Sequence, residues 1–312
     1  MPKALLHPIQ IAAARSGLSQ HVIRVWERRY GAVKPKRDDF GRRLYSNKEI
    51  ERLASLREVT QAGRSIGTIA QLSAKQLKNL IAKSRLAQSI GVSRVSAAVR
   101  AECLDAVKLL DAGALEEALQ RGLVVFGQQG FLQTVVAPLA EEVGAFWRDG
   151  TMTAAHEHFF TASARVFLGR LNKEFAPGSG MPNLIVCTPT GQAHELGAFM
   201  VGVAATHLGW RVAYLGPGLP AAEIAGAALQ HRAIAVALSI IYPEDDPNLP
   251  GELLSLRRYL SSDTHIIVGG RAAPAYRETL VRIGALVVGS LSECGEALDR
   301  LRSERAVVGP RT

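Results

Sequence analysis

The amino-acid sequence predicts a chain of several domains: a mainly α-helical head of the winged helix-turn-helix kind, a four-helix bundle, and an α/β domain with a doubly wound sheet of five parallel strands. Three observations lead to this prediction. The chain has 312 residues, enough for two or three hydrophobic cores. Its apolar residues first follow helical spacing and later form short runs that alternate with helices. Its basic residues gather at one end. We assign residues 5–75 to the head, 76–95 to a linker, 96–175 to the bundle and 184–304 to the α/β domain.

The charge distribution sets the head apart from the rest of the chain. Residues 1–85 contain 18 Lys and Arg against 6 Asp and Glu, a net charge of +12, whereas the remainder has 19 against 22, a net charge of −3. A basic segment on a slightly acidic body is typical of a nucleic-acid-binding head. The three cysteines are too few and too scattered for a disulfide framework or a zinc site, so we expect them to be buried. No apolar run reaches the ~18 residues that span a membrane. The N-terminus also lacks the layout of a signal peptide, so we expect a cytoplasmic protein with no membrane partner.

The head begins with two helices separated by a short turn. The first covers Ile9–Arg15, and Ser19 is a good N-cap for the second, which runs to Arg29. Trp26 lies on the apolar face of the second helix and is predicted to be core. The outward positions of this helix, predicted to contact DNA, are Gln20, His21, Arg24 and Arg28. Arginines there can bond guanine edges or phosphates, and the sequence leaves open which of them reads a base.

A basic hairpin and two further helices complete the head. The hairpin covers residues 34–46, with Gly41 at its tip. Ser46 and Glu49 form a capping box that starts a helix, and a short last helix ends at Leu72. Helix, turn, helix, basic wing and helix is a layout that reads double-stranded DNA. The wing residues predicted to contact phosphates or the minor groove are Arg42, Arg43 and Tyr45.

The bundle is predicted to be helical throughout. Apolar residues recur at spacings of three and four, and glycines at 113 and 150 interrupt the pattern. Four helices of this length form a compact bundle, the last covering Thr153–Lys173. A stretch rich in Pro and Gly at 176–183 is predicted to be a linker.

The α/β domain is predicted from five short apolar strands that alternate with helices and end in a helix at 293–302. The strand candidates are Leu184–Thr188, Arg211–Leu215, Ile234–Ile241, His265–Val268 and Ala285–Val288. Such βα units form a parallel, flavodoxin-like sheet that binds ligands at the carboxyl ends of its strands.

The expected ligand edge of this sheet contains one histidine among small residues. His194 follows the first strand, and Gly216-Pro217-Gly218 follow the second. Other small residues expected at the edge are Gly197, Ser239, Gly269 and Gly270. One imidazole among small residues suits a bulky ligand with one axial bond, whereas a zinc site needs three or four clustered ligands.

Several fixed motifs in the head resemble the winged-helix domain of MerR-type transcription regulators. They are Ala14–Ser19 (Ala-Arg-Ser-Gly-Leu-Ser), Ile23–Gly31, Arg43–Ser46 and Ile50–Leu53. The resemblance implies that double-stranded promoter DNA is a partner of this chain.

The segment Gln192–Gly197 resembles the Asp-x-His-x-x-Gly motif of cobalamin-binding domains of the methionine-synthase type. The resemblance implies that His194 is the axial ligand of cobalt, replacing the cofactor's own base. It also implies that Gly197, Ser239, Gly269 and Gly270 line a pocket for the displaced nucleotide tail. Gln192 stands where the family has Asp. We expect it to hydrogen-bond the histidine ring without a charge and so to weaken the cobalt–histidine bond.

Trp147, followed after nine residues by Glu157 and His158, resembles the helical cap of light-sensing MerR-type regulators of the CarH/LitR type. The resemblance implies that Trp147 packs against the adenosyl group of adenosylcobalamin, with Glu157 and His158 beside it. Arg148 stands where these relatives have the histidine that takes the upper cobalt position after illumination.

The function expected from these resemblances is that of a cobalamin-dependent transcription regulator, a repressor rather than an enzyme. Adenosylcobalamin would favour a DNA-binding dimer or tetramer that competes with RNA polymerase at a promoter, and light would dissolve it. One alternative is a MerR-type regulator that uses the same fold without cobalamin or without a light response, which Gln192 favours. Another is a corrinoid carrier for methyl transfer, which would not need the basic head.

Overall fold

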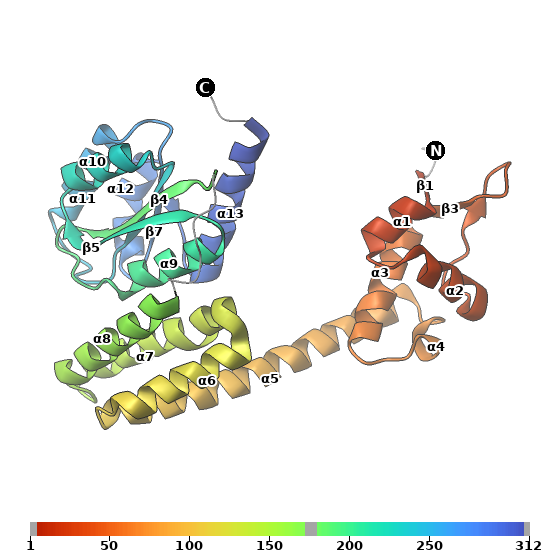
Figure 1. Cartoon of the computed structure of the whole chain (residues 1–312), viewed down its shortest axis with the longest axis horizontal. Helices are drawn as coiled ribbons and strands as arrows, with labels where there is room; N and C mark the ends of the chain where they lie inside the picture. The colour runs from red at the N-terminus through yellow and green to blue at the C-terminus, as the bar shows by residue number, and fades with distance from the viewer. Residues whose placement is uncertain (1–4, 172–179, 309–312) are drawn as a thin grey trace. The chain divides into compact units, whose positions relative to one another are not determined.

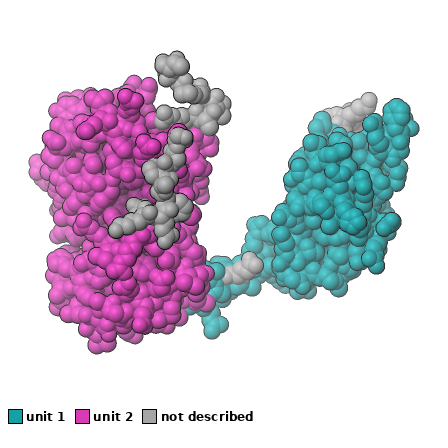
Figure 2. All heavy atoms as spheres, in the orientation of Figure 1, with its two compact units in different colours: residues 1–94 teal, residues 95–312 magenta. Residues whose placement is uncertain are grey.

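The computed structural model describes residues 5–171 and 180–308. The chain divides into two compact units, residues 1–94 and residues 95–312, coloured teal and magenta in Figure 2. The boundary predicted for the last bundle helix at residue 173 and half of the linker predicted at 176–183 lie outside the described residues.

The first unit is built on a three-stranded antiparallel sheet and short helices (Figure 1). Its elements are β1 (Leu6–Pro8), α1 (Ile9–Ser16), α2 (Gln20–Tyr30), β2 (Lys36–Arg37), β3 (Arg43–Ser46), α3 (Asn47–Gln61) and α4 (Ile66–Ile69). The Ser19 side chain caps α2, and the capping box of Ser46 and Glu49 starts α3, as the sequence predicts. Strand β1, which the sequence analysis missed, pairs with β3. The wing is therefore one edge of a sheet rather than an isolated hairpin.

The core of this unit forms where α2 and α3 pack against the sheet. Ile23 and Trp26 of α2 are buried with Leu53 and Leu56 of α3, so the prediction that Trp26 is core is confirmed. This packing leaves the opposite face of α2 in solvent.

Helix α5 (Ala74–Lys108) continues without interruption through the segment predicted as a linker. The segment predicted as a linker, 76–95, is therefore helical. The segment has no proline and only one glycine, and it is rich in Ala, Leu, Lys and Gln, which favour helix. Its apolar pattern is weak because its described side chains from 85 to 95 are all exposed, so no packing face is needed there.

The second unit contains the bundle and the α/β domain. The bundle consists of the second half of α5, α6 (Ala112–Phe131), η1 (Leu132–Val136), α7 (Ala137–Arg148) and α8 (Ala154–Leu171). In the described parts of the chain, Ala112–Arg148 is the one helical run long and apolar enough to cross a membrane. Gly127 has non-helical backbone angles within it, and its buried side chains, Leu119 and Leu139 among them, form the bundle core.

The α/β domain has five parallel strands in the order β5-β4-β6-β7-β8, which confirms the predicted doubly wound sheet. The strands are β4 (Asn183–Pro189), β5 (Arg211–Leu219), β6 (Ala235–Ser239), β7 (His265–Gly269) and β8 (Leu286–Val287). The helical elements are α9 (Leu196–His207), α10 (Ala221–His231), α11 (Leu249–Tyr259), η3 (Ala273–Tyr276), α12 (Arg277–Arg282) and α13 (Leu291–Val308). Gly216-Pro217-Gly218, predicted to follow the second strand, instead belong to β5, because this edge strand pairs irregularly with the end of β4.

Helices cover both faces of this sheet. On one face α10, α11 and α12 bury Ile224, Leu253 and Leu280, and on the other α9 and α13 bury Ala205 and Leu298. Strands β4 and β6 are parallel neighbours, so the loops that follow them lie next to each other at the carboxyl edge of the sheet. This is the switch point at which doubly wound sheets bind ligands.

Candidate functional site

A cavity of about 710 Å³ in the second unit is lined by the bundle helices α7 and α8 and by the carboxyl edge of the sheet. Its volume is within the range of small-molecule sites. Predicted site residues from separate parts of the sequence meet on its wall: Trp147, Glu157, His194, Gly197, Ser239, Gly269 and Gly270. Arg148 lines it as well.

His194 is held on the loop between β4 and α9, with its Nδ1 atom buried and without a hydrogen-bond partner among the described residues. An unpaired buried ring nitrogen is costly unless something else compensates. The histidine ring lies 6.2 Å from the Trp147 ring and 5.9 Å from the Tyr242 ring, measured between centroids. The imidazole is therefore positioned by aromatic contacts.

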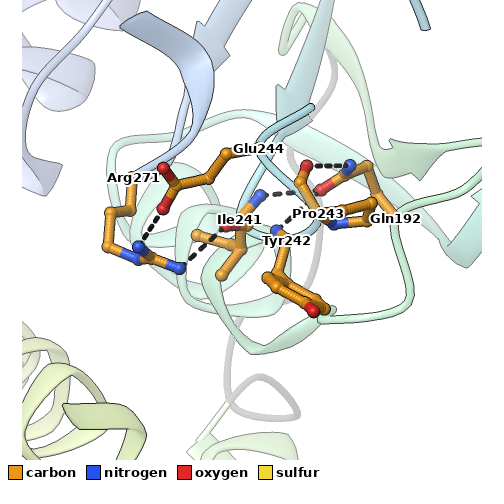
Figure 3. Close-up of polar contacts among 6 residues, drawn as sticks. All are labelled: Gln192, Ile241, Tyr242, Pro243, Glu244 and Arg271. Carbon is orange, nitrogen blue, oxygen red and sulfur yellow. Dashed lines mark hydrogen bonds and ion pairs between the residues drawn. The ribbon is translucent and has the colours of Figure 1, made fainter. Parts of the chain in front are cut away.

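Gln192 does not hydrogen-bond His194, contrary to the expectation from the sequence. The Gln192 side chain is buried, and its Oε1 accepts hydrogen bonds from the backbone N–H groups of Ile241 (2.8 Å) and Tyr242 (3.0 Å). Its Nε2 donates to the Pro243 carbonyl at 3.2 Å (Figure 3). An amide satisfies this pattern because it both accepts and donates, which a carboxylate cannot do. Gln192 thus fixes the loop after β6 rather than the histidine.

Arg271 holds the same loop from the loop after β7. Its guanidinium pairs with Glu244 and donates to the Ile241 carbonyl at 3.3 Å (Figure 3). The loop that contains Ile241–Glu244 is consequently tied to both neighbouring loops.

Tyr242 is a site residue that the sequence analysis missed. Its ring meets His194 edge-on, with an interplanar angle of 89°, and meets Trp147 at 6.4 Å and 81°. Its position three residues after Ser239, at the end of a strand next to β4, was the available signal.

The glycines on the cavity wall are required by close approach. A Cβ atom at Gly197 would lie 2.7 Å from the Ser239 hydroxyl oxygen. Gly270 has a φ of +104°, and a Cβ there would lie 2.3 Å from the Ile240 carbonyl oxygen. Larger residues would crowd the Ser239 side chain at position 197 or displace the Ile240 backbone at position 270.

Glu157 and His158, both predicted to lie beside the adenosyl group, differ in position. The Glu157 side chain lines the cavity and accepts a hydrogen bond from Thr161 Oγ1 at 2.8 Å. The His158 side chain is 79% exposed and does not line the cavity, which corrects the position predicted for it. Its Nδ1 lies 2.5 Å from a Glu157 carboxylate oxygen. His158 therefore reaches the site only through Glu157.

Glu195, directly after His194, connects the bundle to the sheet. Its side chain is 11% exposed and pairs with Arg165 of α8 at 2.5 Å. It also accepts a hydrogen bond from the Tyr214 hydroxyl of β5 at 2.5 Å. Burial, together with this hydrogen bond, raises the pKa of Tyr214. The loop that holds His194 is thereby anchored on both sides.

The three cysteines are free and buried, as predicted. Burial raises the pKa of the Cys103 and Cys187 thiols to about 12 and that of Cys294 to about 11.

On the first unit, the predicted DNA contacts of α2 are exposed: Gln20, His21, Arg24 and Arg28. The wing differs from the prediction at Tyr45. Arg42 is exposed, but Arg43 is partly buried and pairs with Glu27 of α2 at 2.7 Å. Tyr45 is fully buried beside Glu27 and is unavailable to DNA; burial raises its pKa to about 12. Its place in the sheet, beneath α2, explains the error, because alternation along β3 turns it inward.

Both units match families of known proteins. Residues 8–76 match the MerR HTH family regulatory protein profile, and residues 99–172 and 182–299 match two profiles described as B12 binding domains. The chain is 30% identical over 280 residues to the HTH-type transcriptional repressor CarH of Myxococcus xanthus, covering 89% of this chain and 93% of that protein. The chain belongs to the CarH family of MerR-type transcriptional regulators.

A second relative supports the same family. This CarH family member is 26% identical over 298 residues to the HTH-type transcriptional repressor CarA of Myxococcus xanthus, covering 95% and 97% of the two chains. Its structure is similar to that of the monomethylamine corrinoid protein of Methanosarcina barkeri, with a TM-score of 0.52 and 15% sequence identity. The similarity covers 65% of this chain and 96% of that protein. The similarity to the corrinoid protein concerns the fold alone.

The CarH family member is a cobalamin-binding, MerR-type transcriptional regulator, which confirms the resemblances found in its sequence. The residues of the cavity fit the cofactor. His194 lines the cavity with a buried, unpaired Nδ1, and small residues line the same wall: Gly197, Ser239, Gly269 and Gly270.

Proposed function

We propose that this CarH family member is a repressor that binds adenosylcobalamin and releases promoter DNA when illuminated. The observation that supports it is the meeting of Trp147 and Glu157 from the bundle with His194 from the sheet around one cavity. Bound adenosylcobalamin would supply a cobalt–carbon bond that light can break.

The protein's own residues would act on both sides of the cofactor. His194 would hold cobalt from the sheet, while Trp147 and Glu157 would contact the upper group from α7 and α8. Loss of that group would remove contacts of the bundle but not of the sheet. An assembly that depends on the packing of the bundle would then change, because a ligand shifts an equilibrium only by its differential affinity for the two states.

Assembly would couple the cofactor to DNA. Several basic heads on one oligomer would bind a promoter with higher avidity than one head. The DNA-bound oligomer would compete with RNA polymerase for the promoter. The protein would act in the cytoplasm and would catalyse no reaction. Arg148 lies at the cavity and His158 outside it, which argues against capture of cobalt by a second histidine after illumination.

The test uses the purified full chain loaded with adenosylcobalamin in the dark. Its absorbance spectrum, its mass by gel filtration and its affinity for DNA from upstream of its own gene are measured before and after green light. We expect retained corrin absorbance, a larger species in the dark, and weaker DNA binding after illumination. Retained corrin with no change in mass or affinity would contradict light sensing and favour a regulator that responds to the presence of cobalamin.

His194→Ala tests the axial role. We expect loss of the spectrum of histidine-ligated, base-off cobalamin, because no other imidazole lies on the sheet side of the cavity among its lining residues. His265→Ala is the matched control, since His265 is exposed at the amino end of β7. An unchanged spectrum in His194→Ala would remove His194 from the cobalt.

A further inference from the structure

Phe40, at the tip of the wing, is the most exposed large apolar side chain in the described part of the chain, with 84% of its surface accessible. It lies in the turn between β2 and β3, within the same unit as α2. The function described so far assigns it no role.

The turn holds Phe40 outward in a defined geometry. Asp38 Oδ1 accepts hydrogen bonds from the backbone N–H groups of Phe40 (3.1 Å) and Arg42 (2.8 Å). The backbone N–H of Asp38 donates to the Arg42 carbonyl, and that of Gly41 donates to the Asp38 carbonyl. Gly41 has a φ of +77°, which closes the turn without strain only in glycine. The aromatic ring is therefore presented by a preorganised tip, which reduces the entropy lost on binding.

The surroundings of the ring are basic. The guanidinium carbon of Arg42 lies 5.2 Å from the centre of the Phe40 ring. The cationic residues of the hairpin are Lys34, Lys36, Arg37, Arg42 and Arg43, against Asp38 and Asp39. An apolar wedge flanked by cations is complementary to the minor groove of DNA, where phosphates border the stacked bases.

The wing is also fixed to the helix predicted to read DNA. Arg43 of β3 pairs with Glu27 of α2, and Arg24 and Arg28 are exposed on that helix. This connection favours DNA over a membrane surface as the partner of Phe40. The hairpin that carries the ring is joined by an ion pair to α2, whose exposed face is predicted to contact DNA.

We propose that Phe40 is a minor-groove wedge: its ring enters the groove beside the major-groove site of α2 and partly unstacks a base step. This inference rests on the proposed DNA-binding function. A wedge favours steps that unstack easily, so it would add selectivity for pyrimidine–purine steps at a position that α2 does not touch.

The experiment compares Phe40→Ala, Phe40→Leu, Arg42→Ala and Arg24→Ala in the full, cobalamin-loaded chain in the dark. Leu5→Ala is the control for loss of an exposed apolar side chain in the same unit. The probe is a duplex selected from a random library by the unsubstituted protein. Affinity is measured at several salt concentrations, bending by circular-permutation gel shift, and oligomer mass by gel filtration.

We expect Phe40→Ala to weaken binding about tenfold and to reduce bending without changing the salt dependence, because the ring has no charge. Phe40→Leu should retain most of the affinity, since leucine can also act as a wedge. Arg42→Ala should lower the slope of log affinity against log salt by about one.

Unchanged affinity and bending in Phe40→Ala, with weaker binding in Arg24→Ala, would overturn the wedge and leave the DNA-binding function intact. Unchanged binding in both variants would instead contradict the DNA-binding function. A change in oligomer mass without a change in DNA affinity would identify a second copy of the chain as the partner of Phe40 and would also overturn the inference.

Discussion

At the scale of single residues, the donor and acceptor capacity of position 192 decides which group it holds. The Gln192 amide accepts hydrogen bonds from two N–H groups and donates to one carbonyl of the loop after β6, so it is directed at this loop and not at His194. The histidine ring is instead oriented by contacts with the Trp147 and Tyr242 rings, which are not hydrogen bonds. If His194 binds cobalt as proposed, that bond would consequently lack the charge assistance that a carboxylate partner gives.

Gln192→Glu should destabilise the chain at neutral pH by about 1–3 kcal/mol. A carboxylate keeps the length and the acceptor, but it places a buried charge against the Pro243 carbonyl. Burial would raise the pKa of the new carboxyl above its unfolded value, so the folded state would be favoured at low pH and lose stability as pH rises through the folded pKa.

Urea unfolding of Gln192→Glu at pH 5 and pH 8 measures this effect. Gln120→Glu is the control, because Gln120 is exposed on α6. Equal losses of stability at the two pH values would argue against a buried charge at position 192.

Two glycines on the cavity wall should respond differently to alanine. Gly270→Ala combines a φ of +104° with a clash against backbone, so we expect a lower melting temperature. The methyl group of Gly197→Ala would crowd side chains and not backbone, chiefly the Ser239 hydroxyl, so the fold should survive while cobalamin binding weakens. Thermal unfolding and retained corrin absorbance separate the two effects. Gly226→Ala, in open space on α10, serves as the control. Normal cobalamin binding in Gly197→Ala would show that the space above Ser239 is not used.

At the scale of elements, the sequence was most informative where a local signal and a burial pattern agreed. Ser19, the capping box of Ser46 and Glu49, and the apolar runs of the five strands identified their elements correctly. The errors have a different cause. The inward orientation of Tyr45 and the loop contacts of Gln192 depend on neighbours distant in sequence, which local patterns do not contain.

The exposed part of α5 is where a weak pattern hid a continuous helix. Because no core face constrains residues 85–95, their helicity depends mainly on intrinsic preference. Gly91→Ala should stabilise this stretch by up to about 1 kcal/mol, and Gly91→Pro should destabilise it by about 3 kcal/mol.

Hydrogen exchange of the amides from 85 to 95 in the full chain measures the helicity of this stretch. We expect slower exchange in Gly91→Ala and faster exchange in Gly91→Pro than in the unsubstituted chain. Exchange at the random-coil rate in the unsubstituted chain would contradict a continuous α5.

At the scale of the whole molecule, charge and cofactor chemistry belong to different units. The net charge of +12 lies in residues 1–85, whereas the cavity belongs to residues 95–312. Raising salt from 50 to 200 mM should therefore lower DNA affinity steeply, because counterions compete for phosphates, and should leave cobalamin retention nearly unchanged. Anisotropy of labelled DNA and corrin absorbance after desalting measure the two in parallel. A cobalamin retention that fell in step with DNA affinity would contradict this separation.

The burial of all three native thiols makes the folded chain a clean background for site-directed labelling. Thiolates attack maleimide dyes, and burial together with raised pKa values keeps Cys103, Cys187 and Cys294 from reacting. Exposed thiols introduced by Asp39→Cys on the wing and Glu296→Cys on α13 would thus accept a donor and an acceptor dye without removing a native cysteine. Energy transfer between them would follow the spacing of the two units with and without bound adenosylcobalamin.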